Sequence, residues 1–337
     1  MIEAQPAAIR ATTASAARAR SHLPAPRLDR PIYFVGQGTS FHAAIAGAFA
    51  ARRRWPPSVA VEAWPSWEVA TGSVPLDPHG FAIVYSAEGE TALTAEAQRA
   101  LRAAGVPQIL ITAVAAPTSS SRIADATFVT RGATEASWVH TVSYTAAVAA
   151  TLELIGGWSR AGRRVGPELG RAVAGLVARQ RSFRALAGRL RRARTFVLLG
   201  AGAGTATARE AALKVREGAR RFATALGIEE FLHGALPSVD RCTAVLAVAT
   251  TPMERARARE ALTAARIAGA AGVLFARPPV ASGEYGLPDV GVDASPVTDI
   301  VPFQCLVDAI AVQDGRMPDG MGLDDPRQWR ARSSFGV

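Results

Sequence analysis

The sequence predicts an α/β protein built from two similar halves, each with a parallel sheet that is covered by helices on both faces. Three observations lead to this fold class. Short β-branched runs alternate with alanine-rich helical stretches, the runs are apolar almost throughout, and the same order of segments occurs twice along the 337 residues. Strands that are apolar on both faces are typical of parallel sheets buried between two layers of helices.

In the first half, five runs are expected to be strands because each is short and rich in β-branched or aromatic residues. Helical patterns separate them at residues 40–54 and 91–105. The five strands are expected at residues 32–36, 59–63, 81–86, 108–113 and 126–130.

The second half repeats this plan, with strands expected at residues 195–200, 242–250 and 271–276 and helices at 205–221 and 252–269. An arginine- and alanine-rich segment of helical periodicity joins the halves, and the chain after Asp314 shows little periodicity. We therefore expect five parts: an N-terminal helical arm (1–30), a first domain (31–160), a helical connector (161–194), a second domain (195–312) and a C-terminal tail (313–337).

Composition limits the class of protein. Apolar residues make up 49% and charged residues 20% of the chain, a balance typical of a globular protein. The longest apolar runs have the length of strands, and the N-terminus lacks the apolar core of a signal peptide. Cys242 and Cys305 are too few for a disulfide framework or a zinc site. We therefore expect a cytoplasmic protein with no membrane partner.

The formal net charge of +10 raises the question of nucleic-acid binding. However, the arginines are spread over many segments in short clusters, of which 191–192 is one, and no recognition motif accompanies them. We expect no nucleic-acid partner, and local attraction of anions is the more favoured role for such patches.

Two loops offer hydroxyl and backbone N–H groups where ligands gather. "VGQGTSFHA" (35–43) follows the first expected strand and "YSAEGETALT" (85–94) follows the third. In a parallel sheet, loops at the carboxyl ends of strands lead into helix N-termini, which suit a phosphate or a polyol. The same Ser and Thr residues also serve as ordinary N-caps, so the loops alone leave both interpretations open.

Lys214 is the only lysine of the chain, beside 37 arginines. On a helix, Glu210, Lys214 and Glu217 fall at i, i+4 and i+7 and share one face. That face is either an exposed ladder of ion pairs or the floor of a binding site, and the spacing alone does not separate the two.

The two loops, the Glu–Lys–Glu helix, the segment "ATEASWVHTVSYTA" (133–146) and the end "DDPRQWRARSSFGV" together resemble the double-SIS family of sugar isomerases. The likeness is to the isomerase domain of glucosamine-6-phosphate synthase and to stand-alone amino-sugar-phosphate deaminases and isomerases. It runs through the whole chain in order. It implies two tandem SIS domains of flavodoxin-like fold and a tail that closes the active site. We call residues 133–146 the closing segment.

The resemblance also implies roles for three residues. Glu217 would be the base that moves a proton between neighbouring carbons, a task that suits a carboxylate shielded from water. His233 would help to open the sugar ring and would come from the partner subunit of a homodimer. Lys214 would hold a compact positive charge beside the enediolate oxygen and order Glu210, where the wide fork of an arginine would not fit.

By the same resemblance, a further set of residues would line the substrate site. They are Gln37, Gly38, Thr39, Ser40, Ser86, Ala87, Glu88, Thr91, His140, Glu210, Ala331 and Arg332.

Three departures from the family pattern bear on the substrate. Glu88 stands where a serine is usual, and its charge would repel a phosphate by roughly 1–3 kcal/mol per charge pair at 5 Å. Either Glu88 points away from the pocket, or the pocket does not hold a phosphate. Ala331, followed by Arg332, stands where the synthase has an imine-forming lysine, so we expect no Schiff base from the tail. His140 replaces a serine of the closing segment and either binds a sugar hydroxyl or packs beside Trp138.

The leading hypothesis is an aldose–ketose isomerase that acts, without metal or organic cofactor, on a sugar or amino sugar that need not be a 6-phosphate. An alternative is an amino-sugar deaminase or deglycase, which adds release of ammonia or an amine to the same proton transfer. An alternative of another class is a sugar-sensing protein without catalysis.

Overall fold

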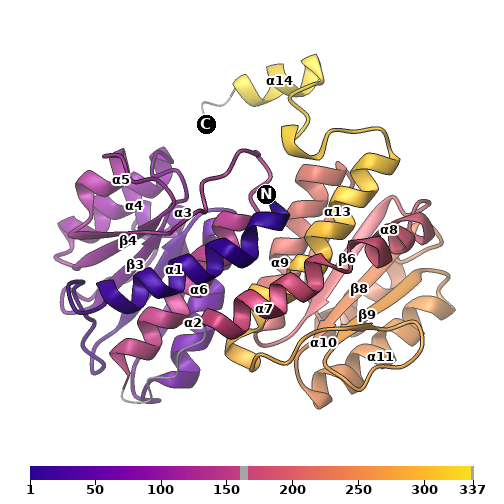
Figure 1. Cartoon of the computed structure of the whole chain (residues 1–337), viewed down its shortest axis with the longest axis horizontal. Coiled ribbons are helices and arrows are strands. Elements are labelled where there is room, and N and C mark those ends of the chain that lie inside the picture. The colour runs from indigo at the N-terminus through magenta and orange to yellow at the C-terminus, as the bar shows by residue number, and fades with distance from the viewer. Residues whose placement is uncertain (160–165, 335–337) are drawn as a thin grey trace.

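The computed structural model describes residues 1–159 and 166–334. Two five-stranded parallel sheets lie side by side, with helices on their faces, as Figure 1 shows. The predicted fold class is therefore confirmed. The strands are β1 (Ile32–Gly36), β2 (Val61–Pro65), β3 (Phe81–Tyr85), β4 (Gln108–Thr112), β5 (Ala126–Val129), β6 (Thr195–Gly200), β7 (Phe222–Gly227), β8 (Thr243–Ala249), β9 (Ala271–Ala276) and β10 (Tyr285–Gly286).

The two sheets have the same strand order. The first runs β2-β1-β3-β4-β5, and the second, taken from its β7 edge, runs β7-β6-β8-β9-β10. In the first sheet β1 is central enough to pair on both sides, so that Ile32 is opposite Val61 on one side and Phe81 on the other. This is the flavodoxin-like order, in which a ligand crevice opens where the chain changes direction across the sheet. In the first half that point lies between the ends of β1 and β3.

Helices surround and join the sheets. The α-helices are α1 (Gln5–Ala19), α2 (Thr39–Arg54), α3 (Ser66–Ala70), α4 (Ala92–Ala103), α5 (Ser119–Ile123), α6 (Val142–Trp158), α7 (Gly166–Val177), α8 (Gln180–Arg189), α9 (Gly204–Lys214), α10 (Ile228–Glu230), α11 (Pro252–Ile267), α12 (Ser295–Asp299), α13 (Val301–Gln313) and α14 (Pro326–Ser333). Two π-helices are η2 (Val215–Ala219) and η3 (Phe231–Ala235), and short 3-10 helices are η1 (Ile2–Ala4), η4 (Leu236–Ser238), η5 (Val292–Ala294) and η6 (Pro318–Gly320).

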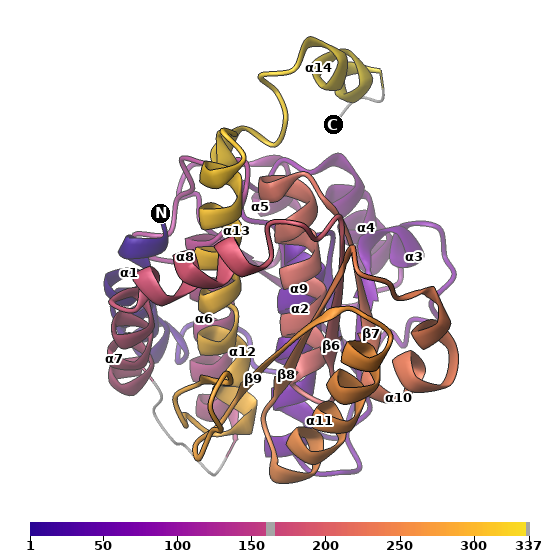
Figure 2. The ribbon, with the colours of Figure 1, turned by 90° about the vertical axis from the view of Figure 1, so that its right-hand side faces the viewer.

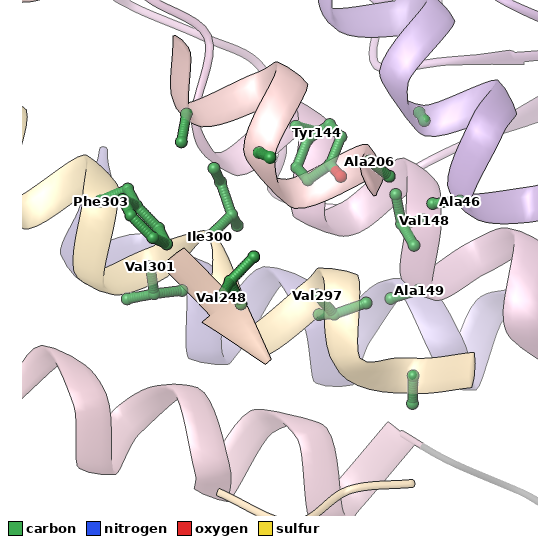
Figure 3. Close-up of a cluster of buried hydrophobic side chains, with 14 of the residues drawn as sticks. Ala46, Tyr144, Val148, Ala149, Ala206, Val248, Val297, Ile300, Val301 and Phe303 are labelled. Atoms are coloured by element: carbon green, nitrogen blue, oxygen red, sulfur yellow. The ribbon is translucent and has the colours of Figure 1, made fainter. Parts of the chain in front are cut away.

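One apolar core spans both halves. Phe34 of β1 and Tyr85 of β3 belong to the same buried cluster as Phe196 of β6 and Phe303 of α13. Helix α2 packs against α9 and α6 against α12, as Figure 2 shows for the first pair. Figure 3 shows this junction, where Val148 of α6, Val297 of α12 and Ala206 of α9 lie close together. The shared core fixes the two halves relative to each other, so that loops of one and a helix of the other can form a common site.

The eight expected strands all form, with ends that differ by a few residues. Strands β7 and β10 were not expected. Strand β7 lies at a sheet edge and begins with the exposed Phe222, so it lacks the continuous apolar pattern of a central strand. The expected helix 205–221 forms as α9 followed by the π-helix η2, which ends at Ala219. The tail contains α14, whose start is capped by the Asp325 side chain.

Helices α7 and α8 lie within the range expected for the connector, and the expected boundary at 160–161 lies outside the described residues. Among the described residues, one helical stretch, Val292–Gln313, is long and apolar enough to cross a membrane. In its most apolar window, 89% is buried inside the fold, as in the core helix of a globular protein.

Candidate active site

A buried cluster of charges joins the two halves where α2 meets α9. The Lys214 ammonium lies 3.3 Å from Glu210 Oε1 and 2.7 Å from Glu217 Oε2, and it donates to Thr39 Oγ1 at 3.1 Å. Thr39 in turn donates to Glu210 Oε1 at 3.1 Å, and His42 Nδ1 lies 2.7 Å from Glu210 Oε2. We call these five residues the charge cluster. The structure thus brings the predicted Glu210, Lys214, Glu217 and Thr39 together.

Exposure increases along the charge cluster from its interior to its mouth. The side chain of Glu210 is 0% exposed and that of Lys214 is 1% exposed, whereas His42 and Glu217 reach 12% and 15%. An exposed ion-pair ladder is therefore wrong as an interpretation of this face. Of the two carboxylates bound to the ammonium, Glu217 is the one that a ligand can reach.

The environment favours the charged forms of the buried pair. Burial alone would raise the pKa of Glu210, but the Lys214 charge and the contact with His42 outweigh it and leave this pKa below its usual value. Burial alone would lower the pKa of Lys214, but the Glu210 and Glu217 carboxylates outweigh it and raise this pKa. The ammonium is therefore a fixed positive charge that is almost fully buried.

Local helix geometry places Glu217 beside this charge. The α-helical bonding of α9 ends at Lys214, and the next five residues form the wider π-helical turn η2. Such turns are rare and recur at functional sites. Gly218 in this turn packs closely, since a Cβ there would lie 2.6 Å from Val307 Cγ1. Glu217 is thereby held on the side of the turn that faces Lys214.

The loops after β1 and β3 border a narrow cleft next to the charge cluster, at the expected switch point of the first sheet. Its volume is about 20 Å³, and it is lined by Thr39, Ser40, Ser86, Ala87 and Tyr144 among others. The loop after β1 is tight, because a Cβ on Gly36 would lie 2.5 Å from the Ser40 carbonyl group, and Gly38 has a φ of 56°. In the loop after β3, the Ser86 hydroxyl accepts a hydrogen bond from the Gly89 N–H at 3.1 Å.

The helices that follow these two loops have no side-chain caps. Gly38 before α2 has no side chain that could accept a hydrogen bond, and the Thr91 side chain before α4 accepts none from the first helical turn. Elsewhere Thr118 and Thr251 form complete capping boxes at α5 and α11. Uncapped N–H groups at two helix starts leave donors for an anion or for sugar hydroxyls.

Glu88 and His140 meet across the rim of the cleft. His140 Nε2 lies 3.7 Å from Glu88 Oε1, and its Nδ1 lies 3.1 Å from Ser143 Oγ. The Glu88 side chain is 63% exposed, so it points toward solvent and the closing segment. Glu135 anchors that segment, since its Oε1 accepts hydrogen bonds from the Ser143 N–H at 2.9 Å and from the Thr141 N–H.

The tail contacts the closing segment. The Trp138 N–H donates to the Asp319 carbonyl at 3.1 Å, and the Arg332 guanidinium lies 5.1 Å from the centre of the Trp138 ring. Helix α14, which carries Ala331 and Arg332, stands above both sheets in Figures 1 and 2. The described residues show no bond from Ala331 or Arg332 to the charge cluster, so closure of the site by the tail remains a prediction.

Two other predicted residues lie apart from the charge cluster. The His233 side chain is 76% exposed, on the π-helix η3, and its Nε2 lies 3.4 Å from Glu229 Oε2. Within the described part of this chain it makes no hydrogen bond with the charge cluster, and its entry from a partner subunit stays a prediction. Gln37 is exposed, and its carbonyl accepts from the Ser40 N–H at 3.1 Å.

A larger cavity of about 320 Å³ borders Lys214. Its wall includes Ser137 and Thr141 of the closing segment and Gln304 and Asp308 of α13, together with Asp319 of the tail. Burial first, and then the nearby Asp319 carboxylate, raise the pKa of Asp308. The volume of this cavity lies at the lower end of the range for small-molecule sites.

The equivalent switch point of the second half is filled by the protein itself. One Glu254 carboxylate oxygen accepts from the Thr250 N–H and hydroxyl at 2.7 Å each and from the Thr251 N–H at 3.2 Å. The other oxygen would lie 3.1 Å from a Cβ on Gly202, which corresponds to Gly38 of the first half. The donors of that loop are therefore already occupied.

The sequence did not single out His42 or Tyr144. His42 lies within "GTSFHA", three residues after Thr39, so both residues fall on one face of the helix. That shared face is the signal in the sequence that could have identified His42. The Tyr144 hydroxyl is buried at the cleft and has no hydrogen-bond partner among the described residues. Burial, and next the negative charge of Glu210, raise the pKa of Tyr144 well above its usual value.

Among the described residues, no group of three or more His, Cys, Asp or Glu side chains is arranged to hold a metal ion. The expectation of a reaction without metal remains a prediction.

Comparison with known proteins identifies relatives, although no family model matches the chain. The chain is 31% identical over 309 residues to glutamine–fructose-6-phosphate aminotransferase [isomerizing] of Pyrobaculum aerophilum, which covers 86% of this chain and 50% of that protein. It is 29% identical over 307 residues to the protein of the same name from Pyrococcus horikoshii, covering 87% and 50%. The chain thus spans about half the length of these relatives.

Solved structures share the fold. The C-terminal domain of glucosamine-fructose-6-phosphate aminotransferase from Francisella tularensis superposes with a TM-score of 0.82 at 20% identity, over 94% of this chain and 96% of that domain.

Replacing Lys214 by Met should lower the free energy of unfolding by about 3–5 kcal/mol at neutral pH, because Glu210 would remain buried without its partner. The lowered pKa of Glu210 contributes stability above its unfolded value of about 4.3 and loses it as pH falls. The raised pKa of Lys214 contributes stability below its unfolded value of about 10.4 and loses it as pH rises. The free energy of unfolding, measured with urea, should therefore differ most between wild type and variant at pH values between about 4.3 and about 10.4.

The double variant Glu210→Gln, Lys214→Met should regain part of this loss, because the unpaired buried charge is gone. Equal stability of wild type and Lys214→Met at pH 7 would contradict the importance of the buried pair.

Proposed function

Since the chain belongs to the SIS family of sugar isomerases, we propose that it is an enzyme that interconverts the aldose and 2-ketose forms of a sugar or amino sugar. The observation that carries this proposal is the position of Glu217, bound to a buried ammonium at 2.7 Å and still partly open at the mouth of the charge cluster. The relatives reported above are named as isomerizing enzymes, which agrees with this reaction class.

In the proposed reaction, Glu217 removes the proton from the carbon next to the carbonyl of the opened sugar. Electrons of the broken C–H bond form the enediolate. A proton then passes from the hydroxyl of the deprotonated carbon to the former carbonyl oxygen, and the same carboxyl group returns its proton to the former carbonyl carbon. A single group can do both because the two carbons are adjacent. The ion pair with Lys214 fixes the orientation of the carboxylate for this transfer.

Lys214 is proposed to stabilise the enediolate oxygen electrostatically. Its ammonium is already desolvated and is held by Glu210 and Thr39, so little reorganisation is needed as charge develops. Glu210 in turn is held by His42 and Thr39. We assign to Glu210, Thr39 and His42 the role of positioning Lys214.

Ring opening is assigned to His233 of a second copy of the chain. Within one chain the imidazole is exposed and apart from the charge cluster, which suits a role in a neighbouring site. Such an arrangement requires a two-fold symmetric homodimer with two shared sites.

The substrate is proposed to carry a hydroxyl or an amine, and no phosphate, at the end that reaches the loop after β3. The Glu88 carboxylate is exposed, but it lies 3.7 Å from His140 of the closing segment and so stays beside the loop that a phosphate would approach. A carboxylate there favours a neutral or cationic group by charge. The uncapped starts of α2 and α4 provide N–H donors for sugar hydroxyls.

A second candidate function is deamination of an amino sugar. The relatives are named as aminotransferases, and the cavity of about 320 Å³ beside Lys214 carries Asp308 and Asp319 in its wall. Asp308 and Asp319 offer carboxylate acceptors to an amine there, beside Lys214 and Arg184 of the same wall. Release of ammonia from an amino sugar would distinguish this reaction from isomerisation alone, and sugar binding without either reaction would indicate a sensor.

The Glu217→Gln variant should lose about 100- to 10,000-fold in turnover while it still binds sugar, because the amide cannot accept the proton. The measurement is incorporation of deuterium at C1 or C2 of a panel of sugars in deuterated water, with binding followed by thermal shift. Glu96→Gln, at an exposed position of helix α4, serves as a control for the loss of one carboxylate. Unchanged exchange in Glu217→Gln would remove Glu217 as the base.

Mixing two inactive variants tests the shared site. A heterodimer of Glu217→Gln and His233→Ala contains one site with both an intact Glu217 and an intact His233 if the histidine acts across the dimer. After random mixing, about a quarter of wild-type activity should return, since half of the dimers are mixed and one of their two sites is complete. If the mixture stays inactive, His233 does not act from the partner subunit.

The Glu88→Ser variant tests the substrate. Removing this charge should raise kcat/KM for a sugar 6-phosphate by about 5- to 100-fold, because roughly 1–3 kcal/mol of repulsion disappears, and should change kcat/KM for the free sugar much less. Glu90→Ser, two residues along the same exposed loop, is the matched control. A wild-type enzyme that prefers the phosphate ester would contradict the proposed substrate.

A further inference from the structure

Six arginines line one open groove at the end of the segment that carries Glu217. The groove has a volume of about 780 Å³, and its wall also contains Phe222 and a single carboxylate, Asp314. Six positive charges against one negative charge leave a net charge of +5 in the wall. The arginines are Arg191, Arg192, Arg194, Arg220, Arg221 and Arg316.

Three of these arginines are held by the protein itself. Arg221 contacts both Asp314 oxygens at 2.8 and 2.7 Å and donates to the Ala193 carbonyl at 2.6 Å. Arg316 donates to the Ala219 carbonyl at 2.7 Å, and Arg220 pairs with Asp324. The only carboxylate in the wall is therefore already engaged.

The other three, Arg191, Arg192 and Arg194, have no carboxylate partner within residues 1–159 and 166–334. Their side chains are exposed, and no acceptor among the described residues binds them. Their backbone is nevertheless fixed, because the Ala193 N–H donates to the Leu190 carbonyl at 2.9 Å and the Arg194 N–H donates to the Cys242 carbonyl at 2.7 Å. A coding preference for arginine over lysine does not explain why three unpaired guanidinium groups gather at one turn.

Phe222 adds a flat apolar surface to the same groove. It is 68% exposed at the start of β7, next to Arg220 and Arg221 in sequence. An exposed aromatic ring can stack with a planar ring of a ligand, while guanidinium groups form paired hydrogen bonds with phosphate oxygens. The combination therefore fits a ligand that has both parts.

We propose that this groove binds a nucleoside polyphosphate, with its phosphates on Arg191, Arg192 and Arg194 and its base on Phe222. The groove is separate from the charge cluster, since the two share no lining residue. The measurement below needs no turnover, so its result does not depend on the proposed isomerase function.

The experiment measures binding of ATP, tripolyphosphate and adenosine to the full chain by isothermal titration calorimetry at fixed salt, without added metal. ATP and tripolyphosphate should bind, with ATP tighter by about fivefold or more through stacking. The triple variant Arg191→Ser, Arg192→Ser, Arg194→Ser should weaken ATP binding by about tenfold or more. Phe222→Ser should remove the preference for ATP over tripolyphosphate.

The matched control is Arg18→Ser, Arg99→Ser, Arg171→Ser, which removes the same charge from exposed positions on α1, α4 and α7. An equal loss of ATP binding in this control would overturn the proposal, because the attraction would then come from the overall charge. Absence of ATP binding, or equal affinity for ATP and tripolyphosphate, would also overturn it. So would displacement of ATP by a single-stranded RNA that binds more tightly through the same three arginines, since the ligand would then be nucleic acid.

Discussion

The buried ammonium of Lys214 is the constraint on which the arrangement of this molecule depends. A charge without water is stable only when neighbouring groups replace its solvation, and here those groups come from both halves of the chain: Thr39 from one, Glu210 and Glu217 from the other. Helices α2 and α9 can therefore meet in one orientation. That orientation also sets the distance between the loops of the first sheet and the carboxylate of Glu217.

The two halves share a topology but contribute differently to the candidate site. The first supplies loops whose helix starts are uncapped, and the second supplies a helix whose last turn is π-helical. Neither half could form the site alone, because a carboxylate base and the donors that orient a sugar must approach the same atoms from different sides. The continuous core between the sheets supplies the rigidity that this geometry needs.

Much of the fold and part of the candidate site could be predicted from the sequence. The features that could not be predicted depend on contacts between residues that are far apart in the chain. Central strands and the shared face of Glu210, Lys214 and Glu217 follow from periodicity, which is a local property. Strand β7 did not follow, because an edge strand with the exposed Phe222 lacks that pattern. The contact of His42 with Glu210, 168 residues away, and that of His140 with Glu88 depend on tertiary packing. Glu88 was recognised as unusual, and its exposed position is one of the two alternatives that the sequence left open.

Glu254 gives the second half an internal substitute for a ligand. Its carboxylate binds the donors of the loop after β8, whereas the helix that follows the corresponding loop of the first half has no side-chain cap. Changes in the two corresponding loops should consequently have different phenotypes: in the second half they affect how well the chain folds, and in the first half they affect what the chain recognises. A duplicated scaffold can in this way keep one copy for recognition and use the other as its internal support.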